Sequence, residues 1–508
     1  MPKGFFISCA IDYPNANLHL GHLYEKTLAD VLARVHRLNG EKVLFSVGTD
    51  DHGEKILEYA RAAGKPPNQF VDEMATRFKS ILDAALISYD TFIRTTDENH
   101  IHAAQHFIQI LYDKGDLYKG DYEGWYCVSD ETFWTEKDLL KIDGVTVCPN
   151  PHCGKPVKKV KEESYFFRWS AYQQALQEWY AQFPSNIIPS FRKHEMDQFM
   201  KQGLKDISFS RKSVEWGIPL PFDESHTIYV WSDALVNYLT VTGYPNDEYE
   251  AFWPADIHVI GMDVNRFHSL LWPAMLLSAG LPLPKQILVH GFINDEKGQK
   301  LSKSIGNFID PQLLISRYGI EAIRYYFLRE TPIGNDLSFS EKNLLARANS
   351  DLADGLGNLV YRVLSMLEKY CHSTIPPAPL DPSILAESTT HSAAAYQSYL
   401  AHDLQSALVH TWKLVTLGNQ SIATQEPWKK MKEGKRSEVE SLLATEVELL
   451  RRIAILITPI LPLSSSAIST QFGFPPPSFS SLQTPLDLKN KPIIKGPVMF
   501  AKKELPAT

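Results

Sequence analysis

The chain has 508 residues, of which 44% are hydrophobic and 22% charged, values that are ordinary for a globular protein. The formal net charge of −8 gives no general attraction for nucleic acid, although a local basic face can coexist with an acidic total. No apolar run reaches the roughly 18 residues that span a bilayer, and five cysteines do not form a disulfide framework. We expect roughly three domains and a cytoplasmic protein without a signal peptide.

The first part of the chain predicts an α/β fold. Residues Gly4–Ala10 are typical of a buried strand, an amphipathic stretch follows from Leu20 to Leu38, and Val43–Val47 is a second apolar run. Strand, helix and strand at this spacing indicate a Rossmann-like parallel sheet with right-handed crossovers. Three later runs are predicted to be further strands, and these are Ile228–Ala234, Ile257–Gly261 and Gln286–Gly291. Ligands in such sheets bind beyond the carboxyl ends of the strands.

The pattern changes twice along the chain. Between residues 115 and 223 the sequence is rich in Trp, Tyr, Lys and Glu, which favours an insertion that splits the parallel-sheet domain. From about Glu341 to Ala467 apolar residues recur at helical spacing and predict a bundle of helices. The tail from Phe472 is rich in Pro and Ser, and we expect it to pack on the body without a core of its own.

The segment His19-Leu20-Gly21-His22 lies between the first predicted strand and the first predicted helix. A helix N-terminus offers unpaired N–H groups and a positive dipole end to phosphate. Gly21 leaves room for a flat adenine or ribose, and the two imidazoles lie on one face of the turn. The alternative is a pair of polar histidines at a helix start that bind no ligand.

The second motif is Lys300-Leu301-Ser302-Lys303-Ser304, with Gly298 before it and Gly306 after it. The glycines indicate a loop that can open and close, and the two lysines place positive charge where pyrophosphate would leave. Nucleotidyl transfer depends mainly on alignment and charge stabilisation. Alone, this segment would be interpreted as a solvated basic loop.

Together, and in this order, the two motifs resemble those of class I aminoacyl-tRNA synthetases. Further segments are similar to blocks of the methionyl-tRNA synthetases, and these are Ile11–Asn15, Gly48–Gly53, Tyr229–Ala234 and Phe267–Ala274. The resemblance implies ATP-dependent ligation of L-methionine to tRNA(Met) through a methionyl-adenylate, for translation initiation and elongation. It also implies ATP with Mg²⁺ as a cosubstrate, and the chain is expected to be a monomer.

The resemblance assigns roles to individual residues. The catalytic residues it implies are His19, His22, Lys300 and Lys303. The ATP-binding residues are Gly21, Glu25, Arg211, Gly261, Asp263 and Ser302. The methionine-binding residues are Ile11, Tyr13, Asp50, Trp231, Leu235, Tyr238, Val264 and His268, with Asp50 holding the substrate ammonium. The anticodon-binding residues are Asn358, Arg362 and Trp428.

With these roles, the chain is predicted to divide into six segments. They are residues 1–114 and 224–295 as the two halves of the catalytic domain, 115–223 as the connective-peptide insertion, 296–345 as the KLSKS loop and its linking segment, 346–470 as the anticodon-binding helical bundle, and 471–508 as the tail. An insertion of about 110 residues is too short for the editing domain that the synthetases for branched amino acids carry.

The chemistry of methionine supports the assignment. Its side chain is unbranched, polarisable and a weak acceptor, so its site should be apolar and aromatic with one or two donors. We expect the Tyr238 hydroxyl and His268 to supply that contact to sulfur. The alternative for Trp231 and Phe267 is an ordinary place in the core of the sheet domain.

Three positions depart from the family pattern. Asp12 stands where a neutral residue is usual, Leu235 where many members have proline, and Met262 where a lysine near ATP is usual. Without that lysine we expect weaker contacts to ATP and no electrostatic role at residue 262.

Cys127, Cys148 and Cys153 are candidates for a structural zinc site, which needs four tetrahedral ligands, typically as two close pairs. The first pair is incomplete because Asp130 stands where the second thiol would be. His152 and Asp130 could complete a ligand set. The sequence nevertheless favours free thiols over bound zinc.

In the helical region, Asn358 and Arg362 are four residues apart and can present an amide and a guanidinium to an unpaired base. Trp428, after Pro427, could stack on a base. The alternative is a solvated arginine and a hydrophobic residue at the edge of the bundle.

Two other functions stay open from the sequence. One is a class I synthetase for cysteine or a branched amino acid. The other is a catalytically silent paralogue that only binds RNA, a reading that Met262 supports and the intact His19 and Lys300 motifs oppose.

Overall fold

The computed structural model describes residues 3–129, 132–134, 136–142, 144–149, 153–301 and 307–504. It divides into two compact units. The first unit contains Met1–Ala29, Val43–Asp83 and Ile87–Phe292, and the second contains Asp30–Lys42, Ala84–Leu86 and Ile293–Thr508. Within the described ranges, no helix combines the length and the apolar character needed to cross a membrane.

Six strands of the described chain form a parallel sheet in the first unit, in the order β3-β2-β1-β14-β15-β9. They are β1 (Phe5–Cys9), β2 (Val43–Thr49), β3 (Thr91–Arg94), β9 (Ile187–Ile188), β14 (Ile257–Gly261) and β15 (Gln286–His290). In the centre of the sheet Ile7 is paired with Phe45 on one side and Ile257 on the other. The central strands are almost continuously buried, as expected for a parallel sheet covered on both faces. This confirms the predicted sheet.

Helices of the first unit surround the sheet. They are α1 (Leu20–Leu38), which continues into the second unit after Ala29, α2 (Glu54–Ala62), α3 (Pro67–Ala84), α4 (Glu98–Asp113), α7 (Val230–Ala234), α8 (Asn237–Thr240) and α9 (Trp272–Ala279). Aromatic side chains form much of the core. The Phe107 ring lies 6.4 Å from that of Tyr244 and 5.9 Å from that of Trp272, between centroids.

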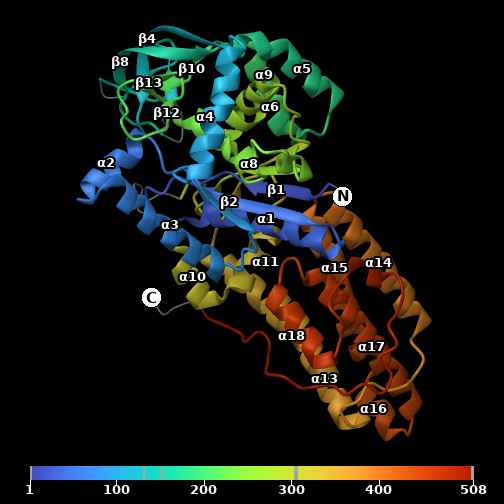
Figure 1. The fold of residues 1–508 in the computed structure, drawn as a ribbon. Helices are drawn as coiled ribbons and strands as arrows, with labels where there is room; N and C mark the ends of the chain where they lie inside the picture. Colours follow the sequence, from blue (N-terminus) through green and yellow to red (C-terminus); the bar gives the residue numbers. More distant parts are fainter. Residues whose placement is uncertain are drawn as a thin grey trace. The chain divides into compact units, whose positions relative to one another are not determined.

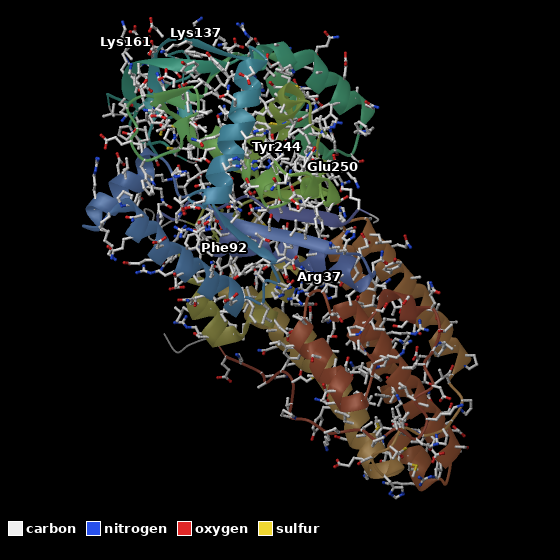
Figure 2. All side chains as sticks on the ribbon, in the orientation of Figure 1. Arg37, Phe92, Lys137, Lys161, Tyr244 and Glu250 are labelled. Carbon is white, nitrogen blue, oxygen red and sulfur yellow. The ribbon has the colours of Figure 1, made fainter. Side chains whose placement is uncertain are left out.

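The region between residues 115 and 223 is mainly antiparallel. One sheet has the order β10-β8-β4-β5, a second has the order β11-β13-β12, and β6 pairs with β7. The strands are β4 (Leu117–Cys127), β5 (Thr132–Trp134), β6 (Leu140–Ile142), β7 (Val145–Val147), β8 (Lys158–Phe167), β10 (Ile207–Ser208), β11 (Ser210–Arg211), β12 (Pro219–Leu220) and β13 (Asp223–Ile228), and the helices are α5 (Gln173–Gln182) and α6 (Ser190–Lys201). Charged side chains such as Lys137 and Lys161 are exposed here (Figure 2).

One predicted strand is wrong. Residues Ile228–Ala234 do not form a strand of the parallel sheet, because Ile228 ends the antiparallel strand β13 and Val230 begins helix α7. A short apolar run does not distinguish a strand from a buried helix. Trp231 and Leu235 are four residues apart, a spacing that places both on one face of a helix.

The second unit is predominantly helical, as predicted (Figure 1). Its helices are α10 (Pro311–Tyr318), α11 (Ile320–Glu330), α12 (Glu341–Arg347), α13 (Asn358–Cys371), α14 (Pro382–Leu400), α15 (Leu404–Gln425), α16 (Pro427–Lys432), α17 (Arg436–Ile457) and α18 (Pro462–Phe472), with a π-helical segment at Ala348–Gly357 and a short parallel pair of β16 (Ile293–Asn294) and β17 (Leu337–Ser338). Leu352, Leu356 and Leu359, which recur at helical spacing in this region, are fully buried. The tail is largely irregular, and its Phe479 and Ile493 side chains are buried.

A buried arginine connects several segments of the second unit. Arg324 on α11 has no exposed surface, and its guanidinium donates to Asp30 Oδ2 at 2.6 Å and to the carbonyl oxygens of Pro459, Ile460 and Ala85. Burial lowers the pKa of Arg324, and the Asp30 charge opposes that shift. The guanidinium therefore provides hydrogen-bond donors to three backbone carbonyl oxygens in the interior of the unit.

We predict that Arg324→Met destabilises the protein by about 3 kcal/mol, because Asp30 and the three carbonyl oxygens lose a donor in the interior. Urea unfolding of the full chain, followed by circular dichroism, measures the change. Arg317→Met is the control, because Arg317 on α10 is exposed and its loss should cost no more than about 0.5 kcal/mol. Equal unfolding midpoints for the two variants would contradict the structural role of Arg324.

Candidate active site

The carboxyl ends of β1, β2, β14 and β15 bring together several of the residues singled out in the sequence. Asp12 follows β1, Asp50 follows β2, Gly261 ends β14 and His290 ends β15. The backbone of Asp12 joins β1 to β2, since Asp12 N–H donates to Gly48 O at 3.0 Å and Asp50 N–H donates to Asp12 O at 2.9 Å. The sheet thus places this group at the edge where ligands of α/β proteins bind.

The imidazoles of His19 and His22 stack at the start of α1, with ring centroids 3.7 Å apart. The Gly21 N–H donates to His19 Nδ1 at 3.1 Å, and the His19 N–H donates to His22 Nδ1 at 3.2 Å. Because both Nδ1 atoms accept hydrogen bonds from the backbone, the Nε2 atoms carry the protons. Gly21 is needed here, since a Cβ would lie 2.9 Å from His19 Cε1. The pair therefore offers two N–H donors beside a helix N-terminus.

A buried lysine lies next to this pair. Lys26 has no exposed surface, and its ammonium donates to Asp12 Oδ1 at 2.6 Å, Glu25 Oε1 at 2.8 Å and Ala10 O at 3.1 Å. Burial raises the pKa of Asp12 to about 6 despite the Lys26 charge. Burial would also raise the pKa of Glu25, but Lys26 and His290 outweigh it and lower that pKa to about 2.

The cluster extends across the sheet edge. His290 Nε2 lies 3.1 Å from Glu25 Oε2, and His22 Nε2 lies 3.9 Å from Asp12 Oδ1. Gly261 is paired with His290 in the sheet, and a Cβ at Gly261 would lie 3.7 Å from the His290 ring. Three of the predicted nucleotide-side residues, Gly21, Glu25 and Gly261, are thus neighbours of one buried charge cluster.

The predicted methionine residues of α7, α8 and the segment after β14 form an aromatic group. The rings of Trp231 and Phe267 stack with centroids 4.0 Å apart. Leu235, Tyr238 and His268 are buried, while Trp231 and Val264 are half-buried. This agrees with the apolar, aromatic surroundings expected around a thioether.

The two proposed sulfur donors instead contact each other. Burial lowers the pKa of His268 to about 4, so the ring is neutral at physiological pH. Its Nδ1 lies 3.0 Å from Val264 O and must donate there, which leaves Nε2 as the acceptor of the Tyr238 hydroxyl at 2.7 Å. The expectation that both groups donate to sulfur therefore needs revision: in this arrangement both protons are engaged within the protein.

Tyr13 lies on the segment after β1, and Asp50 lies on the polar loop after β2. The Tyr13 hydroxyl donates to His52 O at 2.9 Å, and Asp50 is 4% exposed. The neighbouring Asp51 carboxylate accepts from Arg94 at 2.8 Å and Thr96 at 2.7 Å. Asp51 is therefore engaged within the protein.

A buried Asp–His network, which was not predicted from the sequence, lies beside this loop. Asp233 on α7 accepts from His52 Nδ1 at 2.7 Å and from His100 Nε2 at 2.8 Å. Burial would raise the pKa of Asp233, but the two histidines outweigh it and lower it. His52 and Asp233 stand in the segments that carried the family resemblance, whereas His100 lies in α4 with no motif around it. The network connects the Asp50 loop to the helix that carries Trp231.

Arg211 and Met262 each contact a residue of the insertion. Arg211 donates to Glu162 Oε1 at 2.6 Å and lies over the Tyr126 ring, in the wall of a small pocket that also includes His52. The Met262 sulfur lies 3.3 Å from Arg192 Nη2. A guanidinium from α6 therefore lies beside the position where a lysine was expected, while Asp263 is exposed.

The basic loop belongs to the second unit and is described up to Leu301. Lys300 forms a β-bridge with Asn294, and the Asn307 amide donates to Lys300 O at 3.3 Å and to Asp295 Oδ2 at 3.0 Å. Asp295 also accepts from the backbone N–H groups of Lys297 and Gln299, so the turn before Lys300 is ordered by one carboxylate. The predicted residues Ser302 and Lys303 lie outside the described residues.

The structure brings Cys127, Cys148 and Cys153 together. Their sulfur atoms lie within 4.8 Å of one another, and those of Cys127 and Cys153 are 3.5 Å apart. The neighbouring thiols of Cys127 and Cys148 lower the pKa of the Cys153 thiol. These three donors fit a metal ion that takes thiolate ligands. Asp130 and His152, the remaining candidates, lie outside the described residues.

The predicted anticodon residues lie on the helical bundle. Asn358 begins α13 and is exposed, and its amide donates to Asn419 Oδ1 at 3.2 Å. Arg362 is half-buried one turn later. Trp428 on α16 is 41% exposed, a large fraction for a tryptophan. The neighbouring Lys429 and Lys430 form ion pairs with Glu426 and Glu438.

No role in the site was predicted from the sequence for three further residues, Lys26, His290 and Arg192. Lys26 had a usable signal, because it follows Leu23 by three residues and precedes Asp30 by four on the inner face of an amphipathic helix. His290 stood at the end of a predicted strand. Arg192 had no signal, since its approach to Met262 depends on the fold of the insertion.

Comparison with known proteins agrees with this geometry. The family described as tRNA synthetases class I (M) matches residues 5–364. Methionine–tRNA ligases are similar over most of the chain: that of Caldanaerobacter subterraneus is 43% identical over 99% of this chain and 79% of its own length, and that of Thermotoga maritima is 41% identical over 98% and 80%. A Mycobacterium tuberculosis methionyl-tRNA synthetase in complex with methionyl-adenylate superposes with a TM-score of 0.95, at 36% identity over 98% of this chain and 99% of that one. The chain therefore belongs to the methionyl-tRNA synthetase family, within class I of the tRNA synthetases.

Proposed function

We propose that this chain activates L-methionine with ATP and transfers it to tRNA(Met) through a methionyl-adenylate. The observation that carries the proposal is the convergence, at the carboxyl edge of one parallel sheet, of the His19–His22 pair, Asp50 and the nucleotide-side residues Glu25 and Gly261. Adenylate formation requires one site that contacts the phosphates, the ammonium group of the amino acid and the nucleotide together.

In the first step, the methionine carboxylate attacks the α-phosphorus of ATP and pyrophosphate leaves. His19 and His22 donate from Nε2 to the phosphate oxygens as charge develops on them. Asp50 holds the substrate ammonium, and Lys300 and Lys303 neutralise the departing pyrophosphate. Bound Mg²⁺ would supply further charge neutralisation on the phosphates.

Methionine is selected by shape and polarity. Trp231, Leu235, Tyr238, Val264 and His268 surround an unbranched thioether with apolar and aromatic surface, and Ile11 and Tyr13 complete the site. A neutral His268 excludes a charge from the pocket, which disfavours charged substrates. Gly21, Arg211, Asp263 and Ser302 complete the nucleotide side of the proposal.

In the second step, the terminal adenosine hydroxyl of tRNA(Met) takes methionine from the adenylate and AMP leaves. Asn358 and Arg362 would read an unpaired anticodon base, and Trp428 would stack on one. Residues 346–470 are thus the anticodon-binding domain of this proposal and residues 115–223 its connective insertion. We further propose a monomer that works in the cytoplasm.

We also propose that Cys127, Cys148 and Cys153 hold a structural zinc ion, with a fourth ligand from Asp130 or His152. The sequence alone favoured free thiols because one close pair of ligands is incomplete. The gathering of three sulfur atoms reverses that preference, because thiolates so close together repel one another unless a cation or protons lie among them. Zinc would fix the tip of the insertion and take no part in the chemistry.

The role of Lys300 can be tested on the first step. We predict that Lys300→Met lowers kcat for methionine-dependent ATP–pyrophosphate exchange about 100-fold or more and leaves the KM for methionine nearly unchanged, because the lost charge acts on departing pyrophosphate. The matched control is Lys297→Met, since Lys297 is an exposed lysine of the same turn. Equal rates for the two variants would contradict the role of Lys300.

The metal can be tested without an activity assay. We predict about one zinc per chain by mass spectrometry of the purified, dialysed protein, and a strong loss of zinc in Cys148→Ser, because three ligands cannot form a closed tetrahedral site. Cys371→Ser serves as the control, since Cys371 is a buried thiol of the helical bundle. Metal-free wild-type protein, or equal zinc in Cys148→Ser, would refute the site.

A further inference from the structure

A pair of asparagines joins two helices of the second unit. Asn358, the first residue of α13, is exposed, and its amide group donates to Oδ1 of the half-buried Asn419 on α15 at 3.2 Å. Half a turn about the last side-chain bond of an asparagine exchanges its donor and its acceptor. The other partners of Asn419 therefore decide which way round this pair is held.

The amide nitrogen of Asn419 has two acceptors of its own. It donates to the backbone oxygen of Val415, one turn earlier on α15, and to that of Gly355, in the π-helical segment before α13, both at 3.1 Å. Carbonyl oxygens cannot donate, so the Asn419 amide nitrogen must face them. Asn419 Oδ1 then faces Asn358 and can only accept, which requires Asn358 to turn its NH₂ group toward Asn419.

A glycine lets the two helices approach each other at this level. Gly418 directly precedes Asn419, and a Cβ there would lie 2.9 Å from Cδ2 of Leu359, the residue after Asn358. Leu359 is fully buried, so a side chain at Gly418 would force α15 away from α13. Glycine weakens the interior of a helix, so the close approach is kept at some loss of helix stability. The asparagine pair thus depends on a tight contact between the helices.

The orientation of the pair decides what Asn358 offers at the surface. With its amide nitrogen bonded to Asn419, Asn358 keeps Oδ1 as an acceptor, and none of the residues that the structure describes donates to this oxygen. Arg362, one turn later on α13, can only donate. Residues four apart on a helix are neighbours on its surface. Helix α13 therefore offers one acceptor and several donors to a common ligand.

We propose that Asn419 is a positioning residue for tRNA recognition, which fixes Asn358 Oδ1 as the acceptor for the exocyclic amine of an unpaired anticodon base. The inference rests on the anticodon-binding role proposed above for Asn358 and Arg362. In this role Asn419 acts through Asn358 and does not touch RNA. Fixing the amide in advance also reduces the conformational freedom that is lost when the base binds.

The chemistry of the bases limits which of them this acceptor fits. Cytosine and adenine carry an exocyclic amine, whereas uracil and guanine carry a carbonyl oxygen at the corresponding ring position. The anticodon CAU, which pairs with the methionine codon AUG, has such an amine on its first and second bases. An Asn358 amide held in the opposite orientation would donate and would favour the carbonyl oxygens instead.

The test exchanges the amine for a carbonyl oxygen on each of these two bases. Aminoacylation by the full chain is measured with the unchanged tRNA(Met) transcript, with cytosine changed to uracil at the first anticodon position, and with adenine changed to guanine at the second. The selectivity is the ratio of kcat/KM for the unchanged transcript to that for the changed one. We expect Asn419→Ala to lower the selectivity about tenfold at one of the two bases, because the freed Asn358 amide can turn and donate to the carbonyl oxygen.

Matched variants separate positioning from a loss of structure. A weakened bundle would lower kcat/KM for all transcripts in proportion and leave their ratio unchanged, and alanine at a half-buried helix position should keep the urea unfolding midpoint close to that of wild type. Asn419→Asp retains an oxygen that only accepts, so it should keep the selectivity within about threefold of wild type. Thr411→Val is the control, because Thr411 is buried on the same helix and its hydroxyl donates to the Ala407 carbonyl oxygen. It should leave the selectivity unchanged.

A double-mutant cycle tests whether Asn419 acts through Asn358. A carboxylate accepts whichever way it is turned, so Asn358→Asp no longer needs a partner that orients it. In the Asn358→Asp background, Asn419→Ala should therefore cause no further loss of selectivity. Methionine-dependent ATP–pyrophosphate exchange should be unchanged in all of these variants, because none of them alters the adenylation site.

The possible results are distinguishable. If Asn358→Ala leaves the selectivity at both bases as it is in wild type, the anticodon role of Asn358 fails and the inference fails with it. If Asn358→Ala lowers the selectivity but Asn419→Ala does not, or if Asn419→Ala lowers it equally in the Asn358→Asp background, the anticodon role stands and the positioning role of Asn419 is refuted. A wild-type chain that charges no transcript with methionine would refute the proposed function itself.

Discussion

The buried ammonium of Lys26 is the interaction on which the rest of the active site depends. It bonds to the carbonyl oxygen of Ala10, at the end of β1, and to the carboxylates of Asp12 and Glu25. Two carboxylates at this depth would repel each other and lose hydration, so one buried cation between them decides whether the arrangement is stable. Glu25 then extends the cluster to His290 at the end of β15. The first turn of α1, which carries His22, is thereby fixed to the carboxyl edge of the sheet.

This constraint explains why Asp12 is acceptable at a position where the family pattern has a neutral residue. The carboxylate of Asp12 accepts a hydrogen bond from the ammonium of Lys26, one helical turn after His22, so its negative charge has a buried cation beside it. Asp12 also lies 3.9 Å from His22 Nε2, where its negative charge favours the proton on that nitrogen. A departure that looked unfavourable in the sequence is part of a balanced cluster in the folded chain.

Much of the fold could be predicted from the sequence, because local patterns determine it. The run Phe5–Cys9, the helix Leu20–Leu38 and the glycine at position 21 carry their own signals of period, capping and steric need. The segment Ile228–Ala234 was wrongly predicted to be a strand, because its apolar run is too short to distinguish a helix from a strand. The clusters around Lys26 and Asp233 were not predicted, since each unites residues that are distant in the chain. The three cysteines were singled out together in the sequence, and the fold brings their sulfur atoms within 4.8 Å of one another. The Tyr238–His268 hydrogen bond likewise depends on geometry that residue type alone does not give.

The proposed methionine pocket would accordingly select its substrate through packing and neutrality more than through polar contacts. With the Tyr238 hydroxyl donated to His268 and the His268 Nδ1 proton donated to Val264, the aromatic group presents mainly apolar surface. Methionine fits such a surface, because its sulfur is polarisable and is only a weak hydrogen-bond acceptor. Smaller side chains would leave unfilled space, and branched ones would clash. Such differences in shape discriminate between amino acids by about 1–3 kcal/mol of binding free energy per methylene.

The most direct test of this account is ATP–pyrophosphate exchange with the wild-type chain, measured separately with each of the twenty amino acids. The account predicts exchange with methionine at rates far above those with any other amino acid, including leucine, isoleucine and cysteine. Exchange driven by another amino acid would contradict the methionine pocket while leaving the class I chemistry in place. No exchange with any amino acid would contradict the catalytic assignment itself and favour a protein that only binds RNA.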